Sequence, residues 1–256
     1  MTDKEILQIA MEQSAEDIGC KAEDFTKTEN VICKYHMGEK ARKYIKHPVI
    51  GNFVSYGSNV VAAVQDDIRD IAEDYLKKYE FYHLFETPNM NWLNEKLKPL
   101  GYGVCFMAEY YLPKLEMMKE QPCDFELKVL EQKDFTELYI PEWSNALCEE
   151  RKELDVLGVG AYTEGKLAGF AACSADADDM WQIGVDVLPD FRRNGIATYV
   201  TSRLMKEILD RDKVPFYCTA WSNVRSVRNA VKCGFIPAWV EMTVKPLSVI
   251  DEMNTL

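Results

Sequence analysis

The sequence predicts an α/β fold built in two tandem halves, and three observations support this fold class. A chain of 256 residues is long enough for one large domain or two small ones. Strand-like and helix-like patterns of apolar residues alternate from one end to the other. The order strand, helix, glycine-aromatic, strand occurs twice, with Gly101-Tyr102 and Gly234-Phe235 standing 133 residues apart.

The boundary between the halves is indicated by a charged, Met-rich stretch over 114–122. We expect a first half over 1–118, a linker over 119–124 and a second half over 125–256. Each half is long enough to bury a core of its own.

Apolar residues spaced three and four apart predict the helices. The first is marked by Thr2 and Glu5, a capping box directly before Ile6. Gly101 and Gly234 are expected to end two others, because glycine readily adopts the left-handed conformation found at helix C-termini. Helices are expected over 2–18, 39–46, 66–78, 90–100, 133–139, 142–152 and 224–233, and from 195 onward.

Short apolar runs bounded by Gly, Pro, Asn and Asp predict the strands. Glu164-Gly165 separates two such runs and predicts a hairpin. Strands are expected over 53–56, 60–64, 80–85, 104–111, 125–130, 156–162, 166–175, 180–187, 216–220 and 238–244.

Composition disfavours several classes of protein. The 42 acidic residues outnumber the 30 basic ones and give a net charge of −12, whereas a general nucleic-acid binder needs a basic face. No apolar run approaches the roughly 20 residues that span a bilayer. The start of the chain is charged throughout and lacks the apolar block of a signal peptide. We therefore expect a cytoplasmic protein with neither nucleic-acid nor membrane partners.

The eight cysteines and three histidines predict neither disulfides nor a metal site. None of the cysteines forms a CxxC pair, so we expect free thiols in a reducing compartment. Only His36 lies near a cysteine, Cys33, whereas His47 and His83 have no such neighbour. One Cys-His pair does not supply the four ligands of a structural zinc site.

The segment 185–197 carries the clearest chemical signal. A buried strand ends at Val187, and a helix begins near Gly195 after a short polar loop. The first N–H groups of a helix have no internal partner and the helix dipole adds positive potential, so such a junction attracts anions. Gly195 lets a ligand approach the backbone, and Arg192 and Arg193 add two permanent cations. These residues favour a phosphate ligand, although they also suit a polar turn that caps a helix.

The pattern Arg192-x-x-Gly195-x-Ala197, after a strand ending Val-x-Val-x-Pro, resembles the pyrophosphate loop of the Gcn5-related N-acetyltransferase (GNAT) superfamily. The resemblance covers about 125–245 and implies a mixed, mostly antiparallel central sheet flanked by helices. The family's second motif is resembled by Asn223-x-x-Ser226, Ala230 and Lys232-Cys233-Gly234-Phe235.

The first half shares this likeness only through the repeat. Its matching strand-to-helix junction begins Gln65-Asp66-Asp67. Two acids would repel a pyrophosphate. We interpret this half as a degenerate copy that has no cofactor loop.

The resemblance implies an N-acetyltransferase that passes the acetyl group of acetyl-coenzyme A directly to an amine, either a small molecule or a peptide. The loop amides and the Arg192 side chain would hold the pyrophosphate, and two strand residues would pair with the pantetheine arm, which Asn223 would hydrogen-bond. The implied cofactor-binding residues are Val185, Val187, Arg192, Arg193, Asn194, Gly195, Ile196, Ala197 and Asn223.

The sequence does not indicate the catalytic acid or base. The family often has a Tyr that protonates the departing thiolate, and this chain has Ala230 there. The family often has a carboxylate about where Trp181 lies, with Asp179 and Asp186 close by in this sequence. Asp186 alternates with Val185 and therefore faces away from it. Both catalytic roles stay unassigned.

The family's acceptor pocket lies between its early helices and its hairpin. Glu142, Trp143, Glu149 and Glu150 stand in that part of the sequence, and such residues would suit a cationic amine. The favoured interpretation is plainer: the glutamates form a solvated face, and Trp143 packs in the core or at its rim.

Two other functions stay open. The missing Tyr would suit a non-catalytic module that binds acyl-coenzyme A as a sensor. Some tandem members of the superfamily use an aminoacyl-tRNA donor, but the net charge of −12 argues against a tRNA partner. The sequence gives no indication of the oligomeric state.

Overall fold

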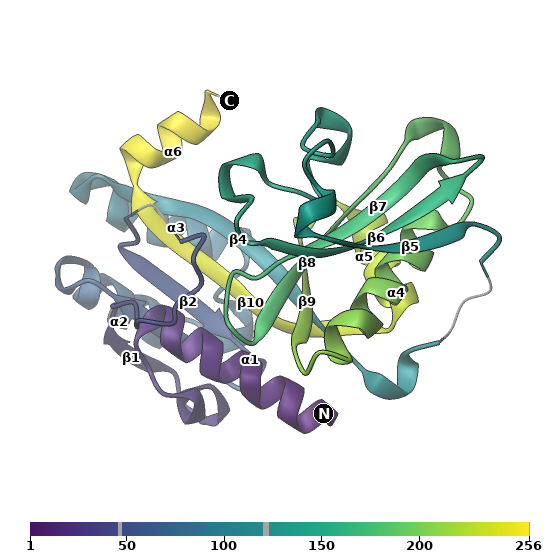
Figure 1. Ribbon diagram of the computed structural model, residues 1–256. Helices are drawn as coiled ribbons and strands as arrows, with labels where there is room; N and C mark the ends of the chain where they lie inside the picture. The colour runs from purple at the N-terminus through teal and green to yellow at the C-terminus, as the bar shows by residue number, and fades with distance from the viewer. Residues whose placement is uncertain (46–47, 120–122, 256) are drawn as a thin grey trace. The chain divides into compact units, whose positions relative to one another are not determined.

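The computed structural model describes residues 1–45, 48–119 and 123–255 (Figure 1). The chain divides into two compact units. Unit 1 comprises Met1–Ile9 and Tyr110–Pro237, and unit 2 comprises Ala10–Glu109 and Ala238–Leu256. The secondary structure is a mixed, mostly antiparallel sheet with flanking helices, which confirms the predicted fold class.

Unit 1 is built on strands in the order β4-β9-β8-β7-β6-β5. It holds only the last four residues of β4 (Tyr102–Pro113). β5 to β8 are antiparallel neighbours, whereas β8 and β9 run parallel. The elements are β5 (Glu126–Glu131), β6 (Asp155–Thr163), β7 (Lys166–Ser174), β8 (Met180–Val187), α4 (Ile196–Leu209), β9 (Val214–Thr219) and α5 (Val224–Cys233).

The two faces of this sheet are covered differently. Helices α4 and α5 cover one face, where Val200, Leu204 and Ala230 are fully buried with strand residues. The segment that precedes β6 covers the other face, where Trp143 packs edge-on against Phe170. The functional features described below lie where this second layer meets β8 and β9.

Unit 2 has strands in the order β1-β3-β2-β10-β4 and a core of its own around Phe53, Tyr75 and Met242. Most of α1 and the larger parts of β4 and β10 belong to it. The elements are α1 (Asp3–Ile18), β1 (Val31–Lys34), β2 (Gly51–Ser55), β3 (Val61–Val64), α2 (Arg69–Lys78), α3 (Thr87–Leu97), β4 (Tyr102–Pro113), β10 (Phe235–Pro246) and α6 (Leu247–Asn254).

The compact units are discontinuous in sequence, unlike the predicted segments 1–118 and 125–256. Strand β10 follows α5 of unit 1, yet most of it, residues 238–246, belongs to unit 2. Strand β4 follows α3 of unit 2, yet its last residues, 110–113, belong to unit 1. Each strand also follows a left-handed glycine, Gly101 or Gly234. The tandem interpretation stays a prediction, and residues 120–122 of the predicted linker lie outside the described residues.

Strong local signals predicted the elements best. Thr2 and Glu5 form the expected capping box, with the Thr2 N–H donating to Glu5 Oε2 at 2.7 Å. The hairpin turns at Glu164 (φ 49°) and Gly165 (φ 78°), as a two-residue turn with two left-handed positions requires. The expected helices at 66–78, 90–100, 195 onward and 224–233 are present, although the first and second begin or end in a 3-10 turn.

Four predicted elements were wrong. The expected strand at 80–85 is a 3-10 turn, Phe81–His83, and the expected helix at 39–46 is a series of turns, with residue 46 outside the described residues. The expected helices at 133–139 and 142–152 are 3-10 turns joined by irregular chain. Pro141 explains part of this, because it forces the extended conformation on Ile140. Strand β1 and helix α6 were not predicted.

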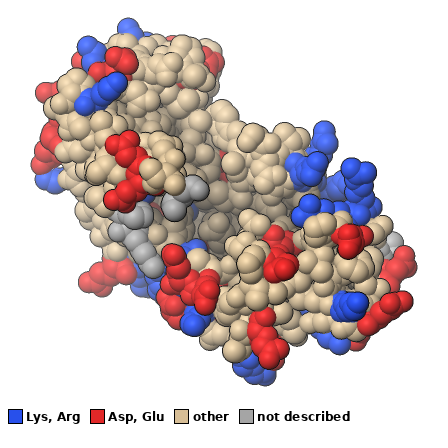
Figure 2. Space-filling view, turned by 90° about the horizontal axis from the view of Figure 1, so that it is seen from above, with Lys and Arg blue, Asp and Glu red and all other residues tan. Residues whose placement is uncertain are grey.

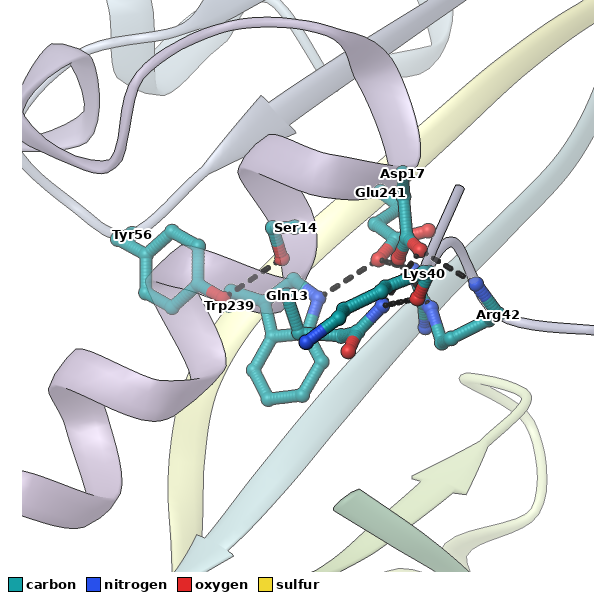
Figure 3. A network of polar contacts seen from close by, with 8 residues as sticks. All are labelled: Gln13, Ser14, Asp17, Lys40, Arg42, Tyr56, Trp239 and Glu241. Atoms are coloured by element: carbon teal, nitrogen blue, oxygen red, sulfur yellow. Dashed lines mark hydrogen bonds and ion pairs between the residues drawn. The ribbon is translucent and has the colours of Figure 1, made fainter. Parts of the chain in front are cut away.

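A buried ion cluster explains why residues near 42 are not helical (Figure 3). Arg42 Nε bonds to Asp17, and the Arg42 backbone N–H donates to Asp17 Oδ1 at 2.7 Å. Arg42 Nη2 lies 2.6 Å from Glu241 Oε1, which also accepts from Trp239 Nε1 at 2.8 Å. The three ionic side chains are at most 5% exposed. These tertiary bonds fix the segment against α1 and β10 more strongly than weak helix propensity could.

Among the described residues, no helix combines the length and the apolar character needed to cross a bilayer.

The buried cluster gives a stability prediction. Arg42→Met should lower the free energy of unfolding by about 3–5 kcal/mol, because two buried carboxylates lose their cation. Urea unfolding measures this value. Arg203→Met is the matched control: its ion pair with Glu207 is half exposed, so the loss there should stay under about 1 kcal/mol. Equal losses for the two variants would contradict a stabilising role for the cluster.

Candidate active site

The β8–α4 junction exposes a row of backbone N–H groups. After β8 ends at Val187, a 3-10 turn (Pro189–Phe191) leads to Arg193 (φ 69°) and Gly195 (φ 79°), and both have left-handed backbone. Residues 192–195 are exposed. The first helical bond of α4 runs from the Tyr199 N–H to the Gly195 carbonyl. The N–H groups of 196–198 therefore have no acceptor within the helix.

The conformation of this loop demands glycine at position 195. A Cβ atom there would lie 3.1 Å from the Tyr199 ring, and the positive φ is strained for any other residue. Within the part of the chain that the structure describes, the N–H groups of 193–195 donate to no loop carbonyl and to no side chain. The junction is therefore a set of unpaired donors at the positive end of a fourteen-residue helix.

Strands β8 and β9 part beside this loop. Their parallel pairing runs from Met180 with Val214 to Ile183 with Tyr217 and stops there, although β8 continues for four more residues. The Leu188 N–H donates to Ala168 on the β7 side. Because successive residues of a strand point their backbone groups to opposite edges, those of Val185 and Val187 point to the side where β9 has diverged. That stretch of strand edge has room for an extended ligand.

Basic side chains accompany the exposed amides. The Arg192 Nε donates to the Val187 carbonyl at 3.0 Å, so the guanidinium lies over the end of β8. Arg193 is exposed, and Arg225 and Arg228 lie in the first turns of α5. None of these four forms an ion pair in the described part of the chain. These arginines therefore add positive charge to an acidic chain. On the face drawn in Figure 2, Lys and Arg side chains gather in several local groups.

A cavity of about 440 Å³ begins where the strands part. Its walls are the segment 144–148, the diverging parts of β8 and β9, and the start of α5. Val185 and Asn223, two of the predicted cofactor residues, line it. Its size is in the range of small-molecule sites.

Asp186 holds the 144–148 wall against β8. Its carboxylate accepts from the Asn145 N–H at 2.9 Å, from Asn145 Nδ2 at 2.7 Å and from the Ala146 N–H at 3.0 Å. Gly184, on the same face, allows the close approach, because a Cβ there would lie 1.9 Å from the Asn145 carbonyl oxygen. Asp186 thus faces away from Val185, as the alternation of strand residues predicted. Its carboxylate holds the 144–148 segment in place.

Two buried carboxylates that the sequence analysis did not single out line the cavity. Asp155, at the start of β6, is 1% exposed and accepts from the Cys148 N–H at 3.0 Å and the Tyr139 hydroxyl at 3.3 Å. Burial raises the pKa of Asp155 to about 6. Asp176 forms an ion pair with Arg151 at 2.6 Å. The signal for Asp155 was present: it is a charged residue at the head of an otherwise apolar strand.

A hydroxyl pair lies on the opposite wall. The Tyr217 hydroxyl lies 2.8 Å from Ser226 Oγ, and both residues line the cavity. Burial raises the pKa of Tyr217, so the phenol keeps its proton at neutral pH. Asn223 caps α5, with its Oδ1 accepting from the Ser226 N–H at 3.2 Å. Ala230 is fully buried in the core between α4, α5 and the sheet.

Other residues considered from the sequence lie away from the cavity. Trp143 is 4% exposed and packs in the core, as the favoured interpretation predicted. Asp179 is exposed and pairs with Lys213 at 2.9 Å. The side chains of three glutamates are also exposed: Glu142, Glu149 and Glu150. Trp181 packs against the core that includes α4.

The remaining titratable side chains are not arranged for metal binding. Among the described residues, which exclude His47, no three His, Cys, Asp or Glu side chains come together as ligands. All eight cysteines are free thiols, and burial raises the pKa of Cys233 to about 11.

In unit 2, the β3–α2 junction carries Asp66, paired with Lys34, and Asp67, which accepts from the Tyr102 hydroxyl at 2.7 Å. These carboxylates are negatively charged and would repel a phosphate.

Helix-terminal amides beside a parted pair of parallel strands are suited to a phosphate-bearing ligand that lies along a strand edge, and they point to a particular class of α/β protein. Comparison with protein families identifies the class: the GNAT acetyltransferase model matches residues 64–238, more than half of the chain. The chain therefore belongs to the GNAT acetyltransferase family, as the motifs had suggested.

The chain is also similar to several solved structures. A GCN5-related N-acetyltransferase-like protein from Streptococcus suis is 21% identical, with a TM-score of 0.43, over 60% of this chain and 66% of that one. A GNAT-family acetyltransferase from Colwellia psychrerythraea is 14% identical, with a TM-score of 0.45, over 77% and 82%. A Salmonella typhimurium protein solved with its cofactor acetyl-CoA is 17% identical, with a TM-score of 0.36, over 48% and 92%. No curated protein matches the sequence.

The role of Asp186 can be tested by stability. Asp186→Ala should lower the free energy of unfolding by about 1–3 kcal/mol, because two backbone N–H groups of the cavity wall lose a charged acceptor. Amide hydrogen exchange should accelerate at residues 145 and 146 in particular. Asp179→Ala, which removes an exposed carboxylate, should change neither quantity appreciably. Unchanged exchange at 145 and 146 would show that another contact holds the wall.

Proposed function

We propose that this protein is an N-acetyltransferase that uses acetyl-coenzyme A and a small-molecule amine. One observation carries the proposal: the N–H groups of the loop and first helical turn at 193–197 follow directly on the free backbone edge of β8, whose Val185 lines a cavity. A diphosphate suits the first feature, and an extended amide-containing arm suits the second. Coenzyme A contains both in one molecule.

The chain's own groups divide the binding task. The amides of Arg193, Asn194, Gly195, Ile196 and Ala197, with the Arg192 guanidinium, would hold the pyrophosphate. The backbones of Val185 and Val187 would pair with the pantetheine arm as an added strand. Because Arg192 already occupies the Val187 carbonyl, Val187 would contribute its N–H. Asn223 uses Oδ1 for the helix cap, so its Nδ2 would reach the arm.

The reaction requires three proton movements. The acceptor ammonium loses one proton to water, and its nitrogen forms a C–N bond with the thioester carbonyl carbon while the amides at the parted strand edge stabilise the oxyanion. The nitrogen then loses its second proton as the C–S bond breaks and the sulfur takes a proton, so one proton is released for each acetyl group transferred. The Tyr217 hydroxyl, supported by Ser226, lies in the cavity wall and would donate the proton that the sulfur takes. This donor would replace the Tyr that the family often has where this chain has Ala230.

A sensor that binds acyl-coenzyme A without transfer is the main competing function, and the buried Ala230 is the observation that favours it. Free thiol released from acetyl-coenzyme A in the presence of a panel of amines distinguishes the two. Acceptor-dependent release supports the transferase. Binding without release across the panel would replace the transferase by the sensor.

The cofactor loop can be tested with two glycine variants. Gly195→Ala should weaken coenzyme A binding at least tenfold in calorimetry, since a side chain at φ +79° distorts the loop and meets Tyr199. Gly165→Ala introduces a side chain at φ +78° in the β6–β7 turn, where nothing lies within 4 Å. It imposes the same backbone strain and should leave coenzyme A affinity unchanged. Full affinity in the Gly195 variant would refute the loop assignment.

The hydroxyl pair can be tested by kinetics. Tyr217→Phe should reduce kcat about 10²-fold, the lower range for loss of a general acid, with little change in coenzyme A affinity. Ser226→Ala should have a smaller effect in the same direction. Tyr162→Phe, on β6 and outside the cavity wall, serves as the control. Retention of wild-type kcat by Tyr217→Phe would rule out this proton donor.

A further inference from the structure

The floor of the cavity is a line of polar side chains that crosses three strands. Strand register places Asp155 of β6 opposite Ser174 of β7, and Ser174 opposite Gln182 of β8. Directly paired residues point to the same face of a sheet. All three line the cavity. The cavity therefore extends from the parted strands β8 and β9 to a carboxylate two strands away.

Asp155 retains an unused acceptor. Its Oδ2 takes the two hydrogen bonds from Cys148 and Tyr139, whereas Oδ1 takes none from the described residues. Asp155 also forms no ion pair there, in contrast to Asp176, which pairs with Arg151. A carboxylate that is 99% buried normally has its charge compensated. A cationic group on a ligand that enters the cavity can compensate this negative charge by binding at Oδ1.

We infer that the acceptor of the proposed acetyl transfer is a dicationic amine, whose second basic group binds Asp155 while the first reacts at the parted strands. This inference rests on the proposed function and specifies its substrate class. A primary ammonium suits the site because it is a compact donor that can bond to Oδ1 and to Ser174 or Gln182 beside it.

The strand lattice sets the separation of the two amines. Neighbouring strands lie ~4.8 Å apart and residues along a strand rise ~3.3 Å each. The step from Asp155 across to Gln182, and on along β8 to Gly184 and Val185, therefore spans roughly 10 Å once the reach of the side chain is allowed for. A straight aliphatic chain between two amines covers this distance, whereas a single-carbon amine does not.

The protonation state of Asp155 depends on the groups that surround its carboxylate in the cavity wall. Desolvation raises its pKa to about 6, and the hydrogen bonds it accepts and the Arg151 charge oppose that rise. As the pH falls through 6 the carboxylate takes a proton and loses its attraction for a second ammonium. The titratable groups around it are Tyr139, Cys148, Arg151, Cys173 and Asp176.

The experiment compares α,ω-diamines of three to eight carbons with the monoamines of the same lengths. For the wild-type protein, kcat/KM at pH 8 should favour the longer diamines about tenfold or more, the effect of one charge-assisted hydrogen bond. Asp155→Asn, which keeps an acceptor for Cys148 and Tyr139, should bring the ratio close to one. Asp178→Asn, an exposed carboxylate outside the cavity wall, should retain the preference.

A pH series tests whether the preference for diamines depends on the charge of Asp155 or only on the shape of the cavity. Between pH 8 and 5 the wild-type diamine-to-monoamine ratio should fall, with a midpoint near 6, because both substrates stay protonated and only Asp155 changes charge. The Asp155→Asn ratio should stay flat. A wild-type ratio that does not depend on pH would overturn the inference.

The outcomes also separate this inference from the proposed function. Failure to bind acetyl-coenzyme A in calorimetry would overturn the proposed function itself. Binding and acetylation of monoamines, with no preference for diamines or none that depends on Asp155, would overturn the inference alone. Acetylation of monoamines but of no diamine would do the same, whereas binding of acetyl-coenzyme A without acetylation of any amine would overturn both.

Discussion

The parting of β8 and β9 is the constraint on which the rest of unit 1 depends. Parallel strands that stay paired satisfy each other's backbone groups, and two that part leave donors and acceptors that need a partner. Here the parting follows Ile183, and β8 continues with a free edge to Val187, from which a short loop leads to α4 with its own unpaired N–H groups. The two sets of free backbone groups therefore adjoin, and a ligand that satisfies both must be anionic at one end and strand-like at the other.

Strand β8 performs several tasks because its backbone and its two faces are used separately. The face with Gly184 and Asp186 positions the cavity wall through the 145–146 backbone. The opposite face, with Ile183 and Val185, packs into the core beneath α4. The free backbone edge remains for a ligand. A substitution that rotates or shifts this strand by one residue would exchange the two faces and disturb all three tasks together.

The elements that sequence predicted well are those with a local cause. The Thr2 capping box, the Glu164-Gly165 turn and the glycine that begins α4 each determine their backbone within a few residues. The elements that were wrong have a distant cause. Residues near 42 are held by Asp17 and Glu241, one from an earlier helix and one almost 200 residues away. No local propensity contains that information.

The same distinction explains which parts of the site were predictable. The amides at 193–197 belong to one contiguous motif, so the sequence pattern located them. Asp155 and Ser174 become neighbours only through the register of β6 and β7, and Tyr217 meets Ser226 only when β9 lies beside α5. The 3-10 turns over 132–151 were also unforeseen, and these turns bring Asn145 and Cys148 over the sheet.

The proposed proton donor illustrates how a catalytic role can be supplied by different elements of one fold. A leaving thiolate fixes where a donor must be, but it does not fix which strand or helix supplies it. With Ala230 buried in the core, α5 presents no phenol from that position. β9 instead carries a tyrosine whose hydroxyl reaches Ser226, near the start of the same helix. Because burial keeps that phenol protonated, Tyr217 is suited to serve as the proposed acid, and Ala230 favours the sensor only if Tyr217 does not donate a proton.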